Sequence, residues 1–132
     1  MKTLKLALLG FGSAGRAFAR LLLEKEAEIE ARYDTQVAVT AIVTGSHGTL
    51  ASSAGLDLRA ALDTAEAGSR FPGGETAMEV AERGDYDALL ELTPLNIRTG
   101  QPAIDHIQAA FARGKHVVTA NKGPIAWAYD DL

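Results

Sequence analysis

The sequence contains no cysteine among its 132 residues. This absence excludes disulfide bonds, metal sites built on thiolates and cysteine nucleophiles. Long apolar runs are also missing: 47% of the residues are hydrophobic, but no stretch approaches the ~18–20 uninterrupted apolar residues of a membrane-spanning helix. We therefore expect a domain without a membrane partner.

Positive charge is scarce as well, because 13 Lys and Arg stand against 17 Asp and Glu, for a formal net charge of −4. Nucleic-acid binding needs a basic face that neutralises phosphates, so this balance argues against a nucleic-acid partner. The first residues lead directly into an apolar segment without a signal peptide, which predicts a cytoplasmic protein. The length fits one core, and we predict a single domain over 1–132.

The feature that the sequence does contain is a glycine fingerprint near its start. An apolar segment over 4–9 leads into a turn and then into a helical pattern; the turn consists of Gly10, Phe11, Gly12, Ser13, Ala14 and Gly15. Gly-x-Gly-x-x-Gly between a strand and a helix is typical of dinucleotide binding. Gly10 permits a sharp turn, Gly12 leaves room for a pyrophosphate, and Gly15 lets the helix approach the strand. Backbone N–H groups of the first helical turn would face the phosphates.

The helical pattern after the turn separates two interpretations. Glycine-rich turns are common, so a plain strand-to-helix turn is the alternative to a nucleotide site. We predict a helix from Ser13 to about Ala31, because its first apolar residues lie on one helical stripe: Ala14, Ala17, Phe18, Leu21 and Leu22. With a strand and a helix both in place, we favour nucleotide binding.

Strands and helices alternate along the rest of the chain. We expect strands over 37–44, 87–92 and 116–120, helices over 57–62, 75–83, 99–113 and 125–132, and an irregular connection over 45–55. This alternation predicts an α/β fold, a Rossmann-type doubly wound parallel sheet with helices on both faces. Ligands of such sheets lie beyond the carboxyl ends of the strands, so 10–15, 93–96 and 120–124 should converge on one crevice.

Two segments of this crevice carry candidate chemistry. Thr93 and Pro94 form either a rigid strand exit or contacts with the ribose next to a nicotinamide, and the two interpretations are compatible. Ala120 ends another strand and Asn121 follows it; both would border the cofactor, and Lys122 comes next. A lysine beside the nicotinamide would hydrogen-bond a substrate oxygen and stabilise the charge that develops in hydride transfer. The alternative for Lys122 is an ordinary surface lysine.

The end of the second strand bears on the choice between NAD and NADP. NAD-selective domains carry an acidic residue there, which holds the ribose hydroxyls. This chain has Thr44, Ser46 and His47 instead, with neither a carboxylate nor an arginine in that turn. These side chains suit either a hydroxyl or a 2′-phosphate, and both cofactors stay open. For His47 we favour an ordinary loop residue over a cofactor contact, and for Arg70 a solvated loop arginine over a phosphate contact.

The remaining histidines suggest no site. In the helix over 99–113 we expect the apolar face Ala103, Ile104, Ile107, Ala110 and Phe111 to point inward. His106 is then expected at the surface of that helix, and His116 opens a strand. No His, Asp and Glu cluster has the spacing of metal ligands, and no Ser-His-Asp arrangement is present, so we expect no metal.

Three segments together resemble a known family. Gly10–Arg16, Glu91–Ile97 and Gly114–Pro124 look like the cofactor domain of the homoserine dehydrogenases, and the resemblance covers essentially the whole chain. The third segment is much more specific than the glycine fingerprint. The resemblance implies NAD(P)-dependent interconversion of L-homoserine and L-aspartate 4-semialdehyde by hydride transfer, a step of threonine and methionine biosynthesis. It also implies that Lys122 lies near substrate and nicotinamide, and that Thr93 lies near the cofactor.

The same resemblance implies that a substrate-binding and dimerising region follows this domain in the full-length parent, which would be a homodimer. The chain stops at Leu132, so we expect the isolated polypeptide to be inactive. Two other functions stay open: an oxidoreductase acting on another amino-acid-derived aldehyde, and a stand-alone module that binds or senses nucleotides.

Overall fold

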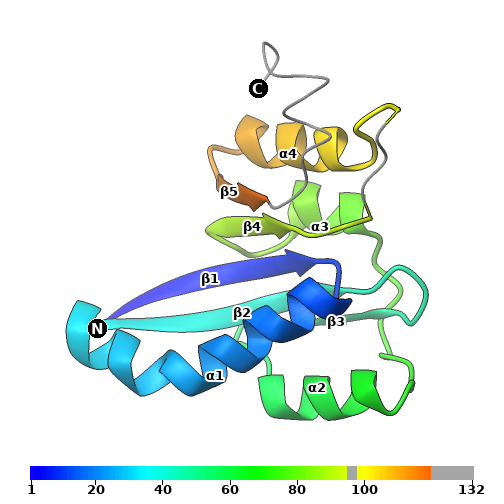
Figure 1. The fold of residues 1–132 in the computed structure, drawn as a ribbon. Helices are drawn as coiled ribbons and strands as arrows, with labels where there is room; N and C mark the ends of the chain where they lie inside the picture. The colour runs from blue at the N-terminus through cyan, green and yellow to red at the C-terminus, as the bar shows by residue number, and fades with distance from the viewer. Residues whose placement is uncertain (95–97, 120–132) are drawn as a thin grey trace.

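A five-stranded sheet forms the centre of the structure, a computed structural model that describes residues 1–94 and 98–119. The strands are β1 (Lys2–Leu9), β2 (Thr35–Val43), β3 (Thr49–Ala51), β4 (Ala88–Glu91) and β5 (His116–Thr119). They lie in the order β3-β2-β1-β4-β5 (Figure 1). β1 is parallel to β2 and β4, and β4 is parallel to β5, whereas β3 runs antiparallel to β2.

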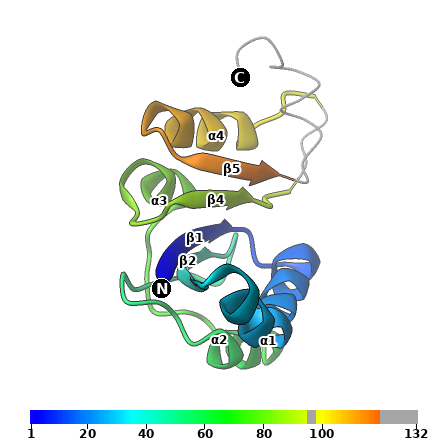
Figure 2. The same cartoon turned by 90° about the vertical axis from the view of Figure 1, so that its left-hand side faces the viewer.

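Helices cover both faces of this sheet. They are α1 (Ser13–Tyr33), α2 (Leu58–Glu66), α3 (Ala77–Arg83) and α4 (Ala103–Ala112). α1 and α2 pack on one face, and α3 and α4 pack on the other (Figures 1 and 2). The predicted Rossmann-type, doubly wound sheet with helices on both faces is therefore confirmed. The helix predicted over 125–132 lies outside the described residues.

The antiparallel edge strand β3 differs from the prediction, which made 45–55 an irregular connection. β3 has three residues, too few to show the alternation of apolar and polar side chains from which a strand is recognised. It is held from both sides: Thr49 exchanges backbone hydrogen bonds with Gly73, and Leu50 pairs with Ile42 of β2. This hairpin brings the connection up to the carboxyl end of β2.

The predicted helix at the glycine turn is present as α1, but the face that it buries coincides only in part with its apolar stripe. Gly15 and Ala19 are the buried residues of α1, and Phe18, Leu22 and Leu23 pack against the core. The other apolar residues of the stripe are exposed: Ala14, Ala17 and Leu21, the last of them by 50%. The cause lies in the glycine turn. Gly15 approaches the carbonyl of Gly10 so closely that an added Cβ would lie 2.6 Å from its oxygen. This contact fixes the rotation of the helix about its axis, which periodicity alone does not determine.

Most of α4 faces inward as predicted, with two exceptions. Ala103, Ile104, Ile107 and Ala110 are buried, but Phe111 is 45% exposed. The inward arc is instead extended by His106, which is buried. The expectation that His106 lies at the surface is therefore wrong, because a polar partner inside the protein, described below, offsets its burial.

Tyr86 ties the end of α3 to α4. The hydroxyl of Tyr86 donates to the Ala81 carbonyl at 2.6 Å. Arg113 donates to the same carbonyl at 3.0 Å, and the Arg113 guanidinium lies 5.0 Å from the ring centroid of Tyr86. Burial raises the pKa of the Tyr86 phenol, and Arg113 partly offsets this.

We expect Tyr86→Phe to lower the free energy of unfolding by about 1 kcal/mol, measured by urea denaturation. The same change at exposed Tyr33 is the control, and an equal loss at the two positions would contradict this role.

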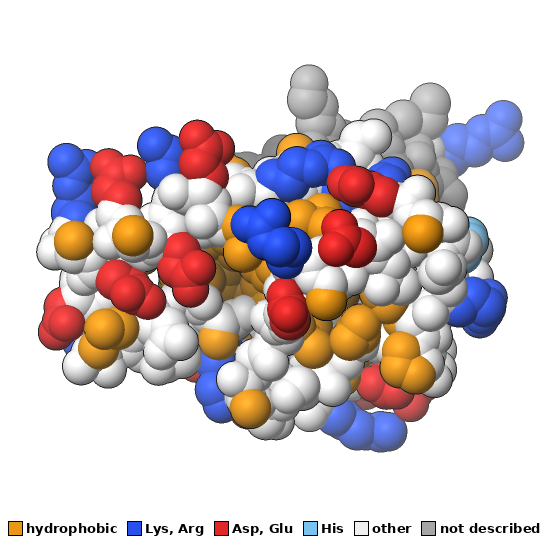
Figure 3. Space-filling model, turned by 90° about the horizontal axis from the view of Figure 1, so that it is seen from below, with side chains coloured by type: hydrophobic (Ala, Val, Ile, Leu, Met, Phe, Trp, Pro, Cys, Tyr) orange, Lys and Arg blue, Asp and Glu red, His pale blue; other side chains and the backbone are white. Residues whose placement is uncertain are grey.

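The outer face of α1 and α2 carries charged side chains of both signs, with hydrophobic side chains and a hollow between them (Figure 3). In the ranges 1–94 and 98–119, no helix combines the length and apolar character needed to cross a membrane.

Candidate functional site

A cleft in two chambers lies at the carboxyl ends of the parallel strands. The larger chamber has a volume of about 560 Å³, and the smaller one about 260 Å³. Thr44, Gly45 and Ser46, at the end of β2, line both chambers. The larger chamber is further lined by Gly10, Arg70, Met78, Thr93, Pro94, Pro102 and His106, among others, and the smaller by Phe11, Gly12, Arg16, His47, Ser69 and Phe71. The cleft thus brings together the ends of β1, β2 and β4. Of the segments predicted to converge there, residues of 10–15 and 93–94 line it, whereas 95–96 and 120–124 lie outside the described residues.

The three glycines of the turn differ in what surrounds them. Gly10 has φ +107°, and a Cβ there would lie 2.4 Å from the carbonyl oxygen of Leu92. Gly15 is equally constrained by Gly10. Gly12, with φ −84°, is not: a Cβ there would meet no atom of residues 1–94 and 98–119 within 4 Å. The fold therefore requires glycine at positions 10 and 15 but not at 12, where the small residue leaves space at the chamber wall.

The amino end of α1 faces this space. Gly12 is its N-cap, no side chain caps the helix, and the first turn contains no acidic residue. The positive end of the helix dipole is thus not neutralised by the helix's own first turn, which suits an anion. Arg16 lies in the next turn, and its Nε donates to the Gly12 carbonyl at 3.3 Å. Ser13 and Ala14, two of the predicted contacts, are exposed in the first turn of the helix.

The loop after β2 is ordered by its own side chains. The hydroxyl of Thr44 donates to the Gly48 carbonyl and accepts from the His47 amide, both at 2.7 Å. The Ser46 hydroxyl lies 2.7 Å from Nδ1 of His47. Arg70 reaches this loop from the segment after α2 and donates to the Ser46 carbonyl at 2.8 Å. Among the described residues that line the smaller chamber there is no Asp or Glu, and Arg16 is one of them. Arg70 lines the larger chamber, as does Glu75.

The end of β4 contains polar contacts that the sequence does not suggest. Glu91 is completely buried, although the rest of β4 is apolar. Its Oε1 accepts from the Thr93 amide at 2.8 Å and from the Thr93 hydroxyl, and its Oε2 lies 2.6 Å from Nδ1 of His106. Thr93 and Pro94 line the larger chamber, as predicted for the crevice. Glu91 and His106 were missed because they are 15 residues apart and meet only in the folded chain.

Three of the predicted site residues, Ala120, Asn121 and Lys122, lie outside the described residues. Their position relative to the cleft rests on the sequence argument alone.

Asp85 is a carboxylate with a clearly shifted pKa, and it lies away from this cleft. A hydrogen bond from the Lys5 ammonium, 2.7 Å away, lowers the pKa of Asp85. Asp85 precedes β4, at the opposite end of the strand from the cleft. Within the described ranges no group of three or more His, Asp or Glu is arranged to hold a metal ion.

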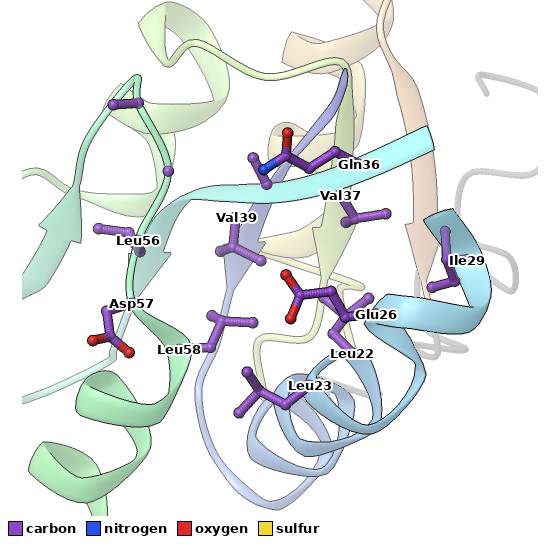
Figure 4. A pocket seen from close by; sticks show the side chains of 13 residues that line it. Leu22, Leu23, Glu26, Ile29, Gln36, Val37, Val39, Leu56, Asp57 and Leu58 are labelled. Carbon is purple, nitrogen blue, oxygen red and sulfur yellow. The ribbon is translucent and has the colours of Figure 1, made fainter. Parts of the chain in front are cut away.

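A second cavity, of about 380 Å³, opens between α1, β2 and the start of α2 (Figure 4). Apolar residues such as Leu22, Val37 and Leu56 line it together with the carboxylates of Glu26 and Asp57. None of the glycines of the turn lines it. It is therefore separate from the predicted crevice, and its residues are a control for ligand binding in the crevice.

Known proteins provide an independent comparison. No family model matches the chain. The homoserine dehydrogenase of Methanocaldococcus jannaschii is 37% identical over 131 residues, which are 95% of this chain and 38% of that protein. The NAD(+)-dependent homoserine dehydrogenase of Pseudomonas canavaninivorans is 33% identical over 139 residues, covering 96% of this chain and again 38% of the relative. The chain thus spans less than two fifths of the length of either relative.

Solved structures give the same result. A candidate homoserine dehydrogenase from Archaeoglobus fulgidus is 34% identical and has a TM-score of 0.79, over 92% of this chain and 35% of that one. A mutant hyperthermophilic archaeal homoserine dehydrogenase in complex with NADPH is 25% identical with a TM-score of 0.78, over 98% and 39% of the two chains. The sequence and the fold of this chain are therefore similar to one part of these proteins.

Proposed function

We propose that this chain is the cofactor-binding domain of an NAD(P)-dependent homoserine dehydrogenase. The similarity to such enzymes over 95% of its length supports this. In this proposal residues 1–132 form the NAD(P)-binding unit, and turnover requires the further length that the relatives have. The substrate pair is L-homoserine and L-aspartate 4-semialdehyde, and their interconversion is a step of threonine and methionine biosynthesis. The full-length enzyme of this proposal is a cytoplasmic homodimer.

The observation that carries the proposal is the open space at Gly12. Nothing in the described fold prevents a Cβ at this position, yet it is glycine and lies at the uncapped end of α1. A pyrophosphate that approaches the backbone closely explains both features, because a side chain would occupy the volume that the phosphates need. The residues present therefore fit a dinucleotide.

The two chambers suit the two halves of such a ligand. The amides of the first turn of α1 would hold the pyrophosphate. Thr44, Ser46, His47 and Arg70 would surround the adenosine ribose, and Thr93 and Pro94 would border the nicotinamide ribose. When bound, the nicotinamide supplies the hydride chemistry, and Lys122 would stabilise the negative charge that develops on the substrate oxygen.

We expect this chain to bind NADP⁺ about tenfold more tightly than NAD⁺. Arg16 lines the smaller chamber, where none of the described lining residues has a carboxylate to repel a 2′-phosphate. Arg70 lines the larger chamber and borders the smaller one, because it donates to the carbonyl of Ser46, which lines both. A charge-assisted hydrogen bond from Arg70 to that phosphate contributes about 1.5 kcal/mol or more, which is roughly tenfold in affinity. Calorimetric titration with each dinucleotide measures the ratio.

Arg70→Ala is expected to remove most of this preference while the affinity for NAD⁺ is retained. The matched control is Arg59→Ala, which removes an exposed arginine of α2 that does not line either chamber. A native chain that folds but binds neither dinucleotide would overturn the proposed function. Equal affinities for NAD⁺ and NADP⁺ would overturn the assignment of Arg70 only.

A further inference from the structure

A buried acid–histidine pair lies behind the wall of the larger chamber. Glu91, the last residue of β4, has no exposed surface, and His106 of α4 is 4% exposed. Their side chains meet at 2.6 Å between Oε2 and Nδ1. The chain thus places a carboxyl and an imidazole together inside the protein.

The pair is completed by Thr93. A carboxylate accepts hydrogen bonds and donates none, so Nδ1 of His106 donates to Oε2. Oε1 accepts from both the amide and the hydroxyl of Thr93. Three donors thus converge on a carboxylate that is removed from water. Loss of any one of them leaves a buried acceptor without its partner, which is costly.

The position of this network relates it to the cleft. Thr93 and His106 both line the larger chamber, together with Pro94 and Pro102 on either side of the loop before α4. Glu91 therefore links two parts of the wall that belong to different elements, the exit of β4 and the start of α4. A shift of Thr93 or of His106 would change the wall where the proposed function puts the nicotinamide riboside.

We infer that Glu91 and His106 are positioning residues for the nicotinamide half of the cofactor: the pair fixes Thr93 and the start of α4 as one preformed wall. This inference rests on the proposed function. Neither residue is assigned a chemical step. A pair that only stabilises the fold would affect both halves of the ligand equally, and this difference makes the inference testable.

The experiment compares two ligands on each variant. NADP⁺ fills both chambers, whereas adenosine 2′-phosphate 5′-diphosphate lacks the nicotinamide riboside. We expect His106→Leu to weaken NADP⁺ binding about tenfold and to leave binding of the shorter ligand within about twofold. His106→Asn should recover most of the NADP⁺ affinity, because its side-chain amide again offers a donor to Glu91.

The outcomes separate the possibilities. Equal losses for both ligands, or native affinity for NADP⁺ in His106→Leu, would overturn the inference while the proposed function stands. Failure of the native chain to bind either ligand would overturn the proposed function itself. Since a missing donor inside the protein can unfold His106→Leu, Thr93→Val is measured alongside it. It removes a single hydroxyl from the same carboxylate, and native affinity for NADP⁺ in that variant would also overturn the inference.

Discussion

The Gly12→Val variant is expected to lose roughly a hundredfold or more in affinity for NADP⁺, equivalent to about 2.7 kcal/mol, while it folds like the native chain. The physical reason is the difference among the three glycines. A Cβ at Gly12 meets no atom of the described residues within 4 Å, so a side chain there would point into the space that a pyrophosphate would use. Because valine is a poorer N-cap than glycine, the free energy of unfolding should change by at most about 1 kcal/mol.

Calorimetric titration and thermal unfolding of the same preparation measure both effects. The matched control is Ala17→Val, which adds a β-branched side chain at an exposed position further along α1. Gly15→Ala provides the opposite case, since its Cβ would lie 2.6 Å from the Gly10 carbonyl oxygen and should destabilise the fold. Unchanged binding in Gly12→Val would show that the glycine turn is only a turn.

The second large effect is expected in turnover. In a full-length enzyme that carries this domain, Lys122→Ala should lower turnover by roughly 10²–10³-fold, the usual consequence of removing a group that stabilises developing charge. The affinity for the cofactor should stay nearly unchanged, because the proposed contact is with the substrate oxygen. Steady-state kinetics with homoserine, together with cofactor titration, distinguishes the two.

Lys115 provides the control for this prediction. Lys115 comes immediately before β5 in the sequence, whereas Lys122 comes after it. Lys115→Ala should leave turnover near the native value. A Lys122→Ala enzyme with native turnover would remove this lysine from the mechanism, and the wall around Thr93 would then be the remaining candidate for substrate contacts.

The parts of the fold that could be predicted are those encoded over short stretches of sequence. A buried strand, a glycine turn and a helix follow one another over 2–33, and each has a local signal. The rotation of α1 is different, because it depends on the contact between Gly15 and the carbonyl of Gly10. β3 is different too: its three residues are a strand only because β2 lies on one side and Gly73 on the other.

The candidate site also contains residues that the sequence predicts and residues that it does not. Gly10, Gly12 and Thr93 are predictable because a parallel sheet brings the carboxyl ends of its strands to one edge. His106 is not, since a histidine in the middle of a helix is normally assigned to the surface from its polarity. Its burial follows from Glu91, which joins it from β4 after folding. A glutamate at the end of an otherwise apolar strand is the only local sign of such a partner.

The central claim is that a dinucleotide binds across the glycine turn with its nicotinamide half toward the end of β4. Backbone amide chemical shifts in an NMR titration with NADP⁺ test this most directly. We expect the amides of Gly12, Thr44 and Thr93 to shift together as the ligand saturates, while Gly55 and Leu56, at the second cavity in Figure 4, stay unchanged. Shifts confined to Gly55 and Leu56, or no shifts in a folded chain, would contradict the claim.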